Sequence, residues 1–328
     1  MQDSNKTILS FVIPLYNAEK YIADCINSIL QSSLQKEAYE IIVVNDGSQD
    51  NGPHIVKEFC KEHSNIHLLS QKNQGQSVAR NYGLKESKGE YVWYIDSDDK
   101  LDPDTLPSTF DALINNRDCD VIAIQEQKIS ENGELKGLSA NQTTLPLFTP
   151  MSGRDAVVSG YYPCSACALI CKKTFLINND LFFKPGITHQ DVELTYRLMP
   201  IANKVIFTDL VPYIYILHPN STSQSINPSK KIKYLCDETY IIESFFKTAS
   251  KYKESDSVLS DVIERRGKNV LLGLTIQLWR NKKVWGKEVN QAVILCLKSN
   301  RLYPNKMKYE RFVKNAIKVL LNFEFLLK

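Results

Sequence analysis

The stretch GEYVWYIDSDD (residues 89–99) joins an apolar run directly to three carboxylates. Residues 91–95 are aromatic or β-branched, which is typical of a buried strand, and Asp96, Asp98 and Asp99 follow it. An aspartate at this point can cap the next helix, but capping needs one aspartate rather than three. Two carboxylates at positions i and i+2 of a turn can bind one hard cation. The stretch therefore predicts a Mg²⁺ or Mn²⁺ site at the end of a central strand.

Apolar runs and amphipathic stretches alternate along the first 127 residues. Strands are predicted at Ile8–Pro14, Ile41–Val44, Ile66–Leu69, Tyr91–Ile95 and Val121–Gln127, and helices at Glu19–Gln31, Gly52–His63, Ser77–Ser87 and Asp104–Asn116. This order over short connections predicts an α/β fold with a mostly parallel central sheet covered on both faces. A further strand is expected near Ala168–Lys172, and residues 128–150 are expected to form a hairpin or a loop. The pattern turns helical later, which predicts an α/β domain at 1–227 and a helical C-terminal region at 228–328.

The charge of the chain divides at the same place. Residues 1–227 contain 19 Lys and Arg against 27 Asp and Glu, whereas residues 228–328 contain 21 against 10. The acidic part suits a metal-dependent site, and the basic part suits an anionic surface. Nucleic acid is one such anionic partner, but no recognition motif accompanies the charge, so no nucleic acid is expected.

The eight cysteines are scattered, which is typical of reduced thiols in a cytoplasmic protein. Cys164, Cys167 and Cys171 form a CxxCxxxC pattern that can hold a metal. No second pair of Cys or His completes a tetrahedral set, so packing in a core is the preferred interpretation. No apolar run approaches the ~18 residues of a membrane span, and the first ten residues lack the layout of a signal peptide. We therefore expect a cytoplasmic location.

Polar clusters follow three of the predicted strands, at residues 16–19, 45–48 and 96–99. Parallel sheets bind ligands at the carboxyl ends of their strands, so the three clusters predict one site at one edge. Asp46 in VNDGS can accept a hydrogen bond from a base or a ribose hydroxyl, or it can simply form an Asx turn. The first strand is not followed by GxGxxG, and no GxxxxGK[ST] occurs in the chain. A dinucleotide-binding fold and a P-loop are therefore not indicated.

Four motifs resemble, in order and spacing, the family 2 glycosyltransferases of the GT-A fold. They are FVIPLYNAEKYIADCINSIL (11–30), IIVVNDGSQD (41–50), QGQSVARNYGL (74–84) and GEYVWYIDSDD (89–99), and the resemblance extends over about residues 7–225. It implies a nucleotide-sugar-binding α/β domain of the GT-A fold, which is Rossmann-like. The stretch Asp96-Ser97-Asp98 stands at the DxD motif of the family. By this resemblance Asp98 is the direct metal ligand, and Asp96 lies near the ribose or the metal.

The resemblance also implies the residues that bind the donor. Tyr16 would lie beside the base, Asp46 would bond to it, and Arg80 would lie near the sugar or the phosphates. The complete set implied for the nucleotide sugar is Pro14, Tyr16, Asn17, Glu19, Asp46, Arg80, Asp96 and Ser97.

Two residues of the second half complete the implied site. In GITHQDVELTYRLM (186–199), Asp191 takes the position of the catalytic base of the family, although Gln190 replaces the usual glutamate before it. On physical grounds alone an aspartate that opens a helix is more often a cap. In PYIYILHPNSTSQS (212–225), His218 is a candidate third metal ligand or, alternatively, a structural histidine.

These parts imply an inverting, metal-dependent transfer of a sugar from a nucleoside-diphosphate sugar to a hydroxyl of a glycan or lipid-linked acceptor, in surface polysaccharide biosynthesis. The metal and Arg80 would neutralise the departing diphosphate, while Asp191 takes the acceptor's proton. The alternative is a catalytically inactive GT-A module that binds nucleotide sugar or scaffolds an assembly complex. The basic, amphipathic residues 305–328 either contact an anionic membrane at its cytoplasmic face or pack on the domain.

Overall fold

The computed structural model describes residues 7–139, 145–162, 165–218 and 227–327. The chain forms two compact units. We call residues 1–186 with 190–218 the α/β unit, and residues 187–189 with 219–328 the helical unit. The predicted domain boundary after residue 227 stays a prediction, because residues 219–226 lie outside the described ranges.

Within the described residues, seven strands of the α/β unit form one sheet in the order β10-β6-β9-β4-β1-β2-β3. Their bounds are β1 Leu9–Leu15, β2 Tyr39–Asp46, β3 Ile66–Gln71, β4 Tyr91–Tyr94, β6 Val121–Ala123, β9 Leu169–Lys172 and β10 Val205–Phe207. Strand β9 is antiparallel to β4 and β6, and the other pairs are parallel. The predicted α/β fold with a mostly parallel sheet is confirmed.

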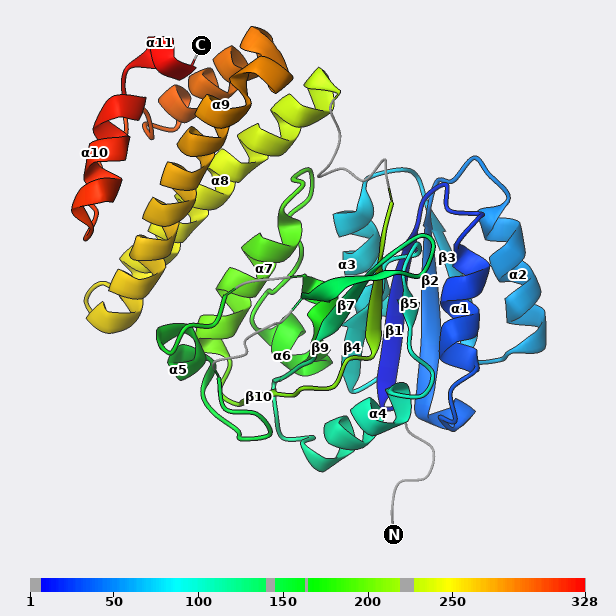
Figure 1. Cartoon of the computed structure of the whole chain (residues 1–328). Coiled ribbons are helices and arrows are strands. Elements are labelled where there is room, and N and C mark those ends of the chain that lie inside the picture. The colour runs from blue at the N-terminus through cyan, green and yellow to red at the C-terminus, as the bar shows by residue number, and fades with distance from the viewer. Residues whose placement is uncertain (1–6, 140–144, 163–164, 219–226, 328) are drawn as a thin grey trace. The chain divides into compact units, whose positions relative to one another are not determined.

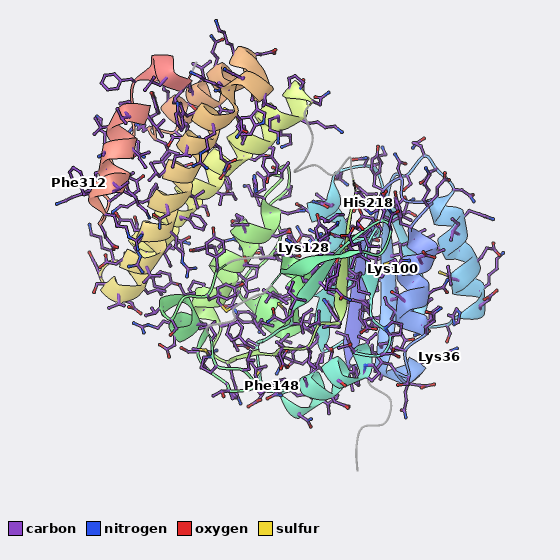
Figure 2. All side chains as sticks on the ribbon, viewed as in Figure 1. Lys36, Lys100, Lys128, Phe148, His218 and Phe312 are labelled. Carbon is purple, nitrogen blue, oxygen red and sulfur yellow. A yellow bond between two sulfur atoms is a disulfide. The ribbon has the colours of Figure 1, made fainter. Side chains whose placement is uncertain are left out.

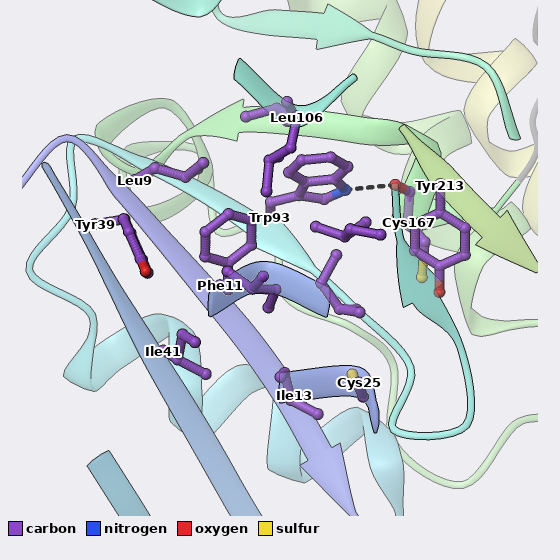
Figure 3. Packing of buried hydrophobic residues seen from close by; sticks show 14 of the residues in the cluster. Leu9, Phe11, Ile13, Cys25, Tyr39, Ile41, Trp93, Leu106, Cys167 and Tyr213 are labelled. Atoms are coloured by element: carbon purple, nitrogen blue, oxygen red, sulfur yellow. Dashed lines mark hydrogen bonds between the residues drawn. The ribbon is translucent and has the colours of Figure 1, made fainter. Parts of the chain in front are cut away.

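Helices cover both faces of this sheet (Figure 1). One face packs against α1 (Ile22–Leu30), α2 (Gly52–Glu62) and α4 (Leu106–Asn115), and the other against α3 (Gln76–Glu86). Phe11 and Trp93 lie in contact in the first core, and the Trp93 indole N–H donates to the Cys167 carbonyl at 2.6 Å (Figure 3). On the second face, a Cβ at Gly83 would lie 2.4 Å from Val12, so glycine lets α3 approach the sheet closely.

A second, small sheet has the order β5-β11-β7-β8, with bounds Lys100–Leu101, Tyr213–Leu217, Glu126–Ser130 and Leu135–Ser139. The prediction of one strand over Val121–Gln127 is wrong. Strand β6 ends at Ala123, because the next backbone N–H groups bond to Ala168 and Leu210 outside the strand. The chain then enters the small sheet at Glu126. The hairpin expected within residues 128–150 is present as β7 and β8, although residues 140–144 lie outside the description.

Shorter helices complete the α/β unit. They are α5 Gly153–Val158, α6 Lys173–Asn178 and α7 Gln190–Leu198, with 3₁₀ turns at Lys36–Ala38, Ala166–Ala168 and Met199–Ile201. Cys167 and Cys171 are buried thiols, and Cys164 lies outside the described residues.

The helical unit contains α8 (Pro228–Tyr252), α9 (Ser257–Ser299, interrupted at Gly286), α10 (Phe312–Leu321) and α11 (Glu324–Leu327). Helices α8 and α9 lie side by side, and Cys236 and Cys296 form a disulfide between them. The expectation of reduced thiols is wrong for this pair, because packing of the two helices brings together cysteines 60 residues apart. None of the described helices combines the length and the hydropathy needed to cross a bilayer.

Candidate active site

The loops that follow β1 and β2, at the carboxyl edge of the central sheet, are joined by hydrogen bonds. Asn17 Oδ1 accepts from the backbone N–H of Gln49 at 2.8 Å, and Glu19 Oε2 accepts from that of Asn51 at 2.8 Å. The structure therefore uses Asn17 and Glu19 as braces between the loops that follow β1 and β2. The ring of Tyr16 is exposed beside them and offers a face on which a base can stack.

Pro14 and Ser97 lie near the point where β4 ends. Pro14 is a buried residue of β1, two positions beyond Val12, whose carbonyl accepts from Ile95. Residues two apart in a strand direct their backbone groups to the same side, so Pro14, like Val12, faces the β4 side. Strand β4 has already ended at this level, so the N–H that proline lacks would have no strand to bond to, and the sheet loses no hydrogen bond. Ser97 is half-buried in the turn between Asp96 and Asp98.

Asp46 is buried at the end of β2 and accepts three hydrogen bonds. They come from Gln71 Nε2 at 2.7 Å and from the backbone N–H groups of Gln74 at 2.9 Å and Gly75 at 2.8 Å. Gly75 has a φ of 90°, which glycine adopts readily. Asp46 thus holds the turn that leads into α3. Its Oδ2 accepts only one of these bonds, which leaves capacity for a base or a ribose hydroxyl.

Arg80 joins two of the predicted site residues. It is fully buried on α3, donates to Asp96, and donates from Nη1 to Asp191 Oδ1 at 3.3 Å. Its guanidinium carbon lies 5.1 Å from the ring centroid of Phe183. Burial lowers the pKa of Arg80, but the two carboxylates raise it more, so the net shift is upward. The structure places Arg80 between the DxD aspartate and the proposed base, as a link between two motifs 95 residues apart.

The aspartates after β4 have different surroundings. Asp99 is buried and accepts from the Tyr213 hydroxyl at 2.7 Å and from the Ile216 N–H at 2.8 Å. The Asp98 side chain is 48% exposed. Burial and then the Asp96 carboxylate raise the pKa of Asp98, and the same two causes raise that of Asp99 further. Asp99 therefore supports the turn, while Asp98 faces outward.

His218 directly follows β11 of the small sheet (Figure 2), and it lies beside Asp98. Its Nε2 is 3.8 Å from Asp98 Oδ2, and its Nδ1 is 2.8 Å from Glu131 Oε1. A second carboxylate on the other ring nitrogen orients a metal-binding imidazole. The described part of the chain contains no converging group of three His, Cys, Asp or Glu side chains. Asp98 and His218 fit Mg²⁺ or Mn²⁺ as a partial donor set that needs further oxygens from substrate or water.

Asp191 is the second residue of α7, and its side chain is 32% exposed. Burial raises the pKa of Asp191, the Arg80 guanidinium lowers it and Asp96 raises it again, with a net upward shift. Its Oδ1 bonds to Arg80, which leaves Oδ2 for an acceptor. Gln190 is buried and accepts from the Ser77 hydroxyl at the start of α3. A neutral amide therefore stands where the family's glutamate was expected.

Sequence reasoning missed Glu126, the first residue of β7. Its side chain is 4% exposed, and Oε1 is buried without a hydrogen-bond partner in the described structure. Burial raises the pKa of Glu126 to about 7. The sequence feature that could have indicated Glu126 is that it is the one acidic residue in the run VIAIQEQ (121–127). The strand predicted over this run gives that residue no special role.

Residues 10–175, half of the chain, match the model of the family described as "Glycosyl transferase family 2". The chain belongs to this family.

Relatives of known sequence agree with this assignment. The chain is 31% identical over 228 residues to the uncharacterized glycosyltransferase YibD of Escherichia coli, over 68% of this chain and 65% of YibD. It is 29% identical to the poly(ribitol-phosphate) β-N-acetylglucosaminyltransferase TarS of Staphylococcus aureus, over 63% of this chain and 35% of TarS. The chain thus spans less than two-thirds of the length of both relatives.

Solved structures share the fold of the chain. TarS residues 1–349 in complex with UDP-GlcNAc match with a TM-score of 0.64 at 18% identity, over 98% of this chain and 90% of that one. A mannosyltransferase of Pyrobaculum calidifontis in complex with GDP-Man and Mn²⁺ matches with a TM-score of 0.55 at 14% identity, over 98% and 86%. At these identities the likeness concerns the fold, which is the GT-A fold that the sequence motifs predicted.

Proposed function

We propose that the chain transfers a sugar from a nucleoside-diphosphate sugar to a hydroxyl group of a glycan or lipid-linked acceptor, with inversion at the anomeric carbon. The observation that carries the proposal is the buried Arg80, which bonds to both Asp96 and Asp191. One guanidinium thus fixes the carboxylate of the donor motif and the carboxylate of the base relative to each other. That geometry suits a donor bound at Asp96 whose anomeric carbon faces an acceptor at Asp191.

The donor end of the site combines an exposed ring with oxygen and nitrogen ligands. Tyr16 offers a stacking face for the base, and Asp46 retains an acceptor for the base or the ribose. Asp98, with His218 and Asp96 beside it, would hold a Mg²⁺ or Mn²⁺ ion, which would supply positive charge to the diphosphate. Support comes from the TarS structure that holds UDP-GlcNAc and from the mannosyltransferase that holds GDP-Man and Mn²⁺.

The acceptor end of the site depends on Asp191. Its Oδ2 takes the proton of the acceptor hydroxyl while the hydroxyl oxygen attacks the anomeric carbon. The bond from that carbon to the diphosphate oxygen breaks, and its electron pair leaves with the nucleoside diphosphate. Arg80 keeps the carboxylate ionised, and burial raises its pKa above that of a solvated aspartate, so it is a stronger base. One base and one displacement invert the anomeric centre, and no covalent intermediate on the protein is needed.

The acceptor proposal includes surface polysaccharide, because TarS is named as a transferase that acts on poly(ribitol-phosphate). A lipid-linked acceptor would be reached at the cytoplasmic face of the plasma membrane. The basic helical region is proposed to meet that anionic surface, and nucleic acid is not proposed as a partner.

The helical unit supports this contact through α10. Phe312 is 84% exposed and projects away from the helix, and Val313 and Leu320 are also exposed, whereas Leu321 is buried (Figure 2). We expect Phe312→Ser to reduce co-sedimentation with vesicles that contain anionic lipid, and to change the unfolding free energy by less than about 0.5 kcal/mol. Equal binding to neutral and anionic vesicles, or no effect of the substitution, would refute membrane contact.

The proposed reaction is tested by a screen of UDP-Glc, UDP-GlcNAc, UDP-Gal and GDP-Man with Mn²⁺ or Mg²⁺, which measures release of nucleoside diphosphate. We expect Asp191→Asn to lower kcat about 100-fold to 10,000-fold, because the variant cannot accept the proton. Asp209→Asn is the matched control, an exposed aspartate of the same unit, and is expected to behave as the wild type. Release that survives both chelation and Asp191→Asn would overturn the mechanism. Donor binding without release by the wild type would favour the inactive module.

A further inference from the structure

Glu126 faces the aspartate loop from the small sheet. It lies in register with Tyr213 of the neighbouring strand β11, and residues in register project from the same face of a sheet. On that face the Tyr213 hydroxyl donates to Asp99 at 2.7 Å and accepts from the Asp96 N–H at 3.2 Å. The side chain of Glu126 therefore projects toward the loop that carries the DxD motif.

The carboxyl group of Glu126 is only partly satisfied. It is 4% exposed and bonds to Ser165, but its Oε1 is buried with no hydrogen-bond partner in the ranges that the structure describes. Lys128 lies on the same face two residues along, and its ammonium group is 5.8 Å from the ring centroid of Tyr215. A buried polar atom without a partner costs free energy, so such atoms are rare unless a ligand or a water completes them.

Glu126 also lies close to both ends of the proposed reaction. On one side, Tyr213, its neighbour in register, accepts from the Asp96 N–H. On the other side, Glu126 bonds to Ser165, which caps the 3₁₀ turn Ala166–Ala168, and this turn packs against α7, the helix that carries Asp191. In the proposed reaction the diphosphate lies at Asp96 and the acceptor hydroxyl at Asp191. The part of the substrate between these two points is the transferred sugar ring.

We propose that Glu126 accepts a hydrogen bond from a hydroxyl or amide N–H of the transferred sugar and thereby selects the donor. The inference rests on the proposed function and adds a specificity residue to it. A site whose buried acceptor is satisfied by one sugar hydroxyl discriminates against the epimer or deoxy sugar that lacks that group. A metal ion is a poorer occupant, since the described residues offer no third ligand nearby.

The test uses the full chain and compares Glu126→Gln with Gln127→Ala. Gln127 is half-buried next to Glu126 in β7 and projects from the opposite face of the sheet, so it is the matched control. Titration calorimetry with Mn²⁺ measures Kd for UDP or GDP alone and for the donor that the wild type turns over fastest in the screen. For Glu126→Gln we expect an unchanged Kd for the free diphosphate, and a Kd for the sugar nucleotide weakened by about tenfold or more. Gln127→Ala is expected to change neither.

A donor series identifies the hydrogen bond itself. Deoxy analogues of the chosen donor each lack one hydroxyl, and the analogue that lacks the recognised hydroxyl is expected to bind wild type and Glu126→Gln equally. Equal weakening for the free diphosphate and the sugar nucleotide, or no weakening at all, overturns the inference. Glu126→Asp gives the same comparison with a shorter carboxylate if the amide variant does not fold. A wild type without turnover of any donor refutes the proposed function instead, so the two failures are distinguishable.

Discussion

Two glutamates of the α/β unit are almost equally buried and have opposite surroundings. Glu40 lies at the amino edge of the central sheet, is 3% exposed, and accepts from the Ser10 hydroxyl at 2.6 Å and from the Lys88 and Gly89 N–H groups. Glu126 lies on the small sheet near the carboxyl edge and keeps one oxygen without a partner in the described residues. The buried carboxylate at the amino edge thus has its partners within the fold, whereas the one near the carboxyl edge, where parallel sheets bind ligands, has an acceptor oxygen unpaired among the described residues.

The largest expected effect concerns the link that Arg80 makes between Asp96 and Asp191. Arg80→Ala removes a buried cation from Asp96 and Asp191 and is expected to lower the unfolding free energy by about 3–5 kcal/mol. The matched control is Arg117→Ala, because Arg117 pairs with Glu90 in the same unit but is 44% exposed, and we expect about 0–1 kcal/mol. Urea unfolding of both variants measures the difference. Equal losses would mean that the carboxyl edge tolerates unpaired charge and that the link is not needed.

The next effect separates two neighbouring aspartates. Asp99→Ala leaves the Tyr213 hydroxyl and the Ile216 N–H without their acceptor and is expected to cost about 2–4 kcal/mol of stability. Asp98→Ala removes a half-exposed carboxylate and is expected to change stability by less than about 0.5 kcal/mol. Donor turnover in Mn²⁺, in contrast, is expected to fall by about 100-fold in Asp98→Ala. If Asp98→Ala were the less stable variant, the distinction between a supporting and a substrate-facing aspartate would be wrong.

The sequence predicted the central sheet well because its strands are unbroken apolar runs and its helices are amphipathic. The polar residues after β1, β2 and β4 were predicted at one edge for the same reason, since the end of each apolar run is visible. The resemblance named Arg80 and Asp191 separately, but their contact joins residues 111 apart and depends on how α3 and α7 pack. Local patterns contain no information on such a pair.

The switch of sheets after β6 could not be predicted. The run VIAIQ continues the apolar pattern across Ile124, but the N–H groups of Ile124 and Gln125 bond to Ala168 and Leu210, which are distant in the sequence. The sequence pattern therefore places Glu126 near the end of a predicted strand, and it does not predict that Glu126 pairs with Tyr213. The Cys236–Cys296 disulfide escaped prediction for a similar reason, because spacing alone does not show that α8 and α9 lie together.

The smallest effect tests the two glutamates directly through pH. Burial raises the pKa of Glu126 from 4.5 to about 7, with Ser165 and Lys128 lowering it and Asp191 and Asp96 raising it. A raised carboxyl pKa contributes stability below pH 4.5 that is lost as the pH rises through 7, whereas glutamine does not titrate. Glu126→Gln should therefore match the wild type at low pH and exceed it at pH 8 by at most about 3 kcal/mol.

Glu40→Gln is the control that sharpens this comparison. All three donors bond to Oε1 of Glu40, and the neutral oxygen of a glutamine in its place accepts these hydrogen bonds more weakly than a carboxylate does. We expect Glu40→Gln to lose about 1–3 kcal/mol and to show no gain at high pH. Urea midpoints of the wild type and the two glutamine variants, measured at pH 4 and at pH 8, give this difference in stability. If both glutamine variants were more stable than the wild type at pH 8, burial of the carboxylate alone, and not its missing partner, would explain the loss of stability. A gain for Glu126→Gln alone means that the wild type retains a carboxylate that weakens the fold, as expected for a group whose partner arrives with the substrate.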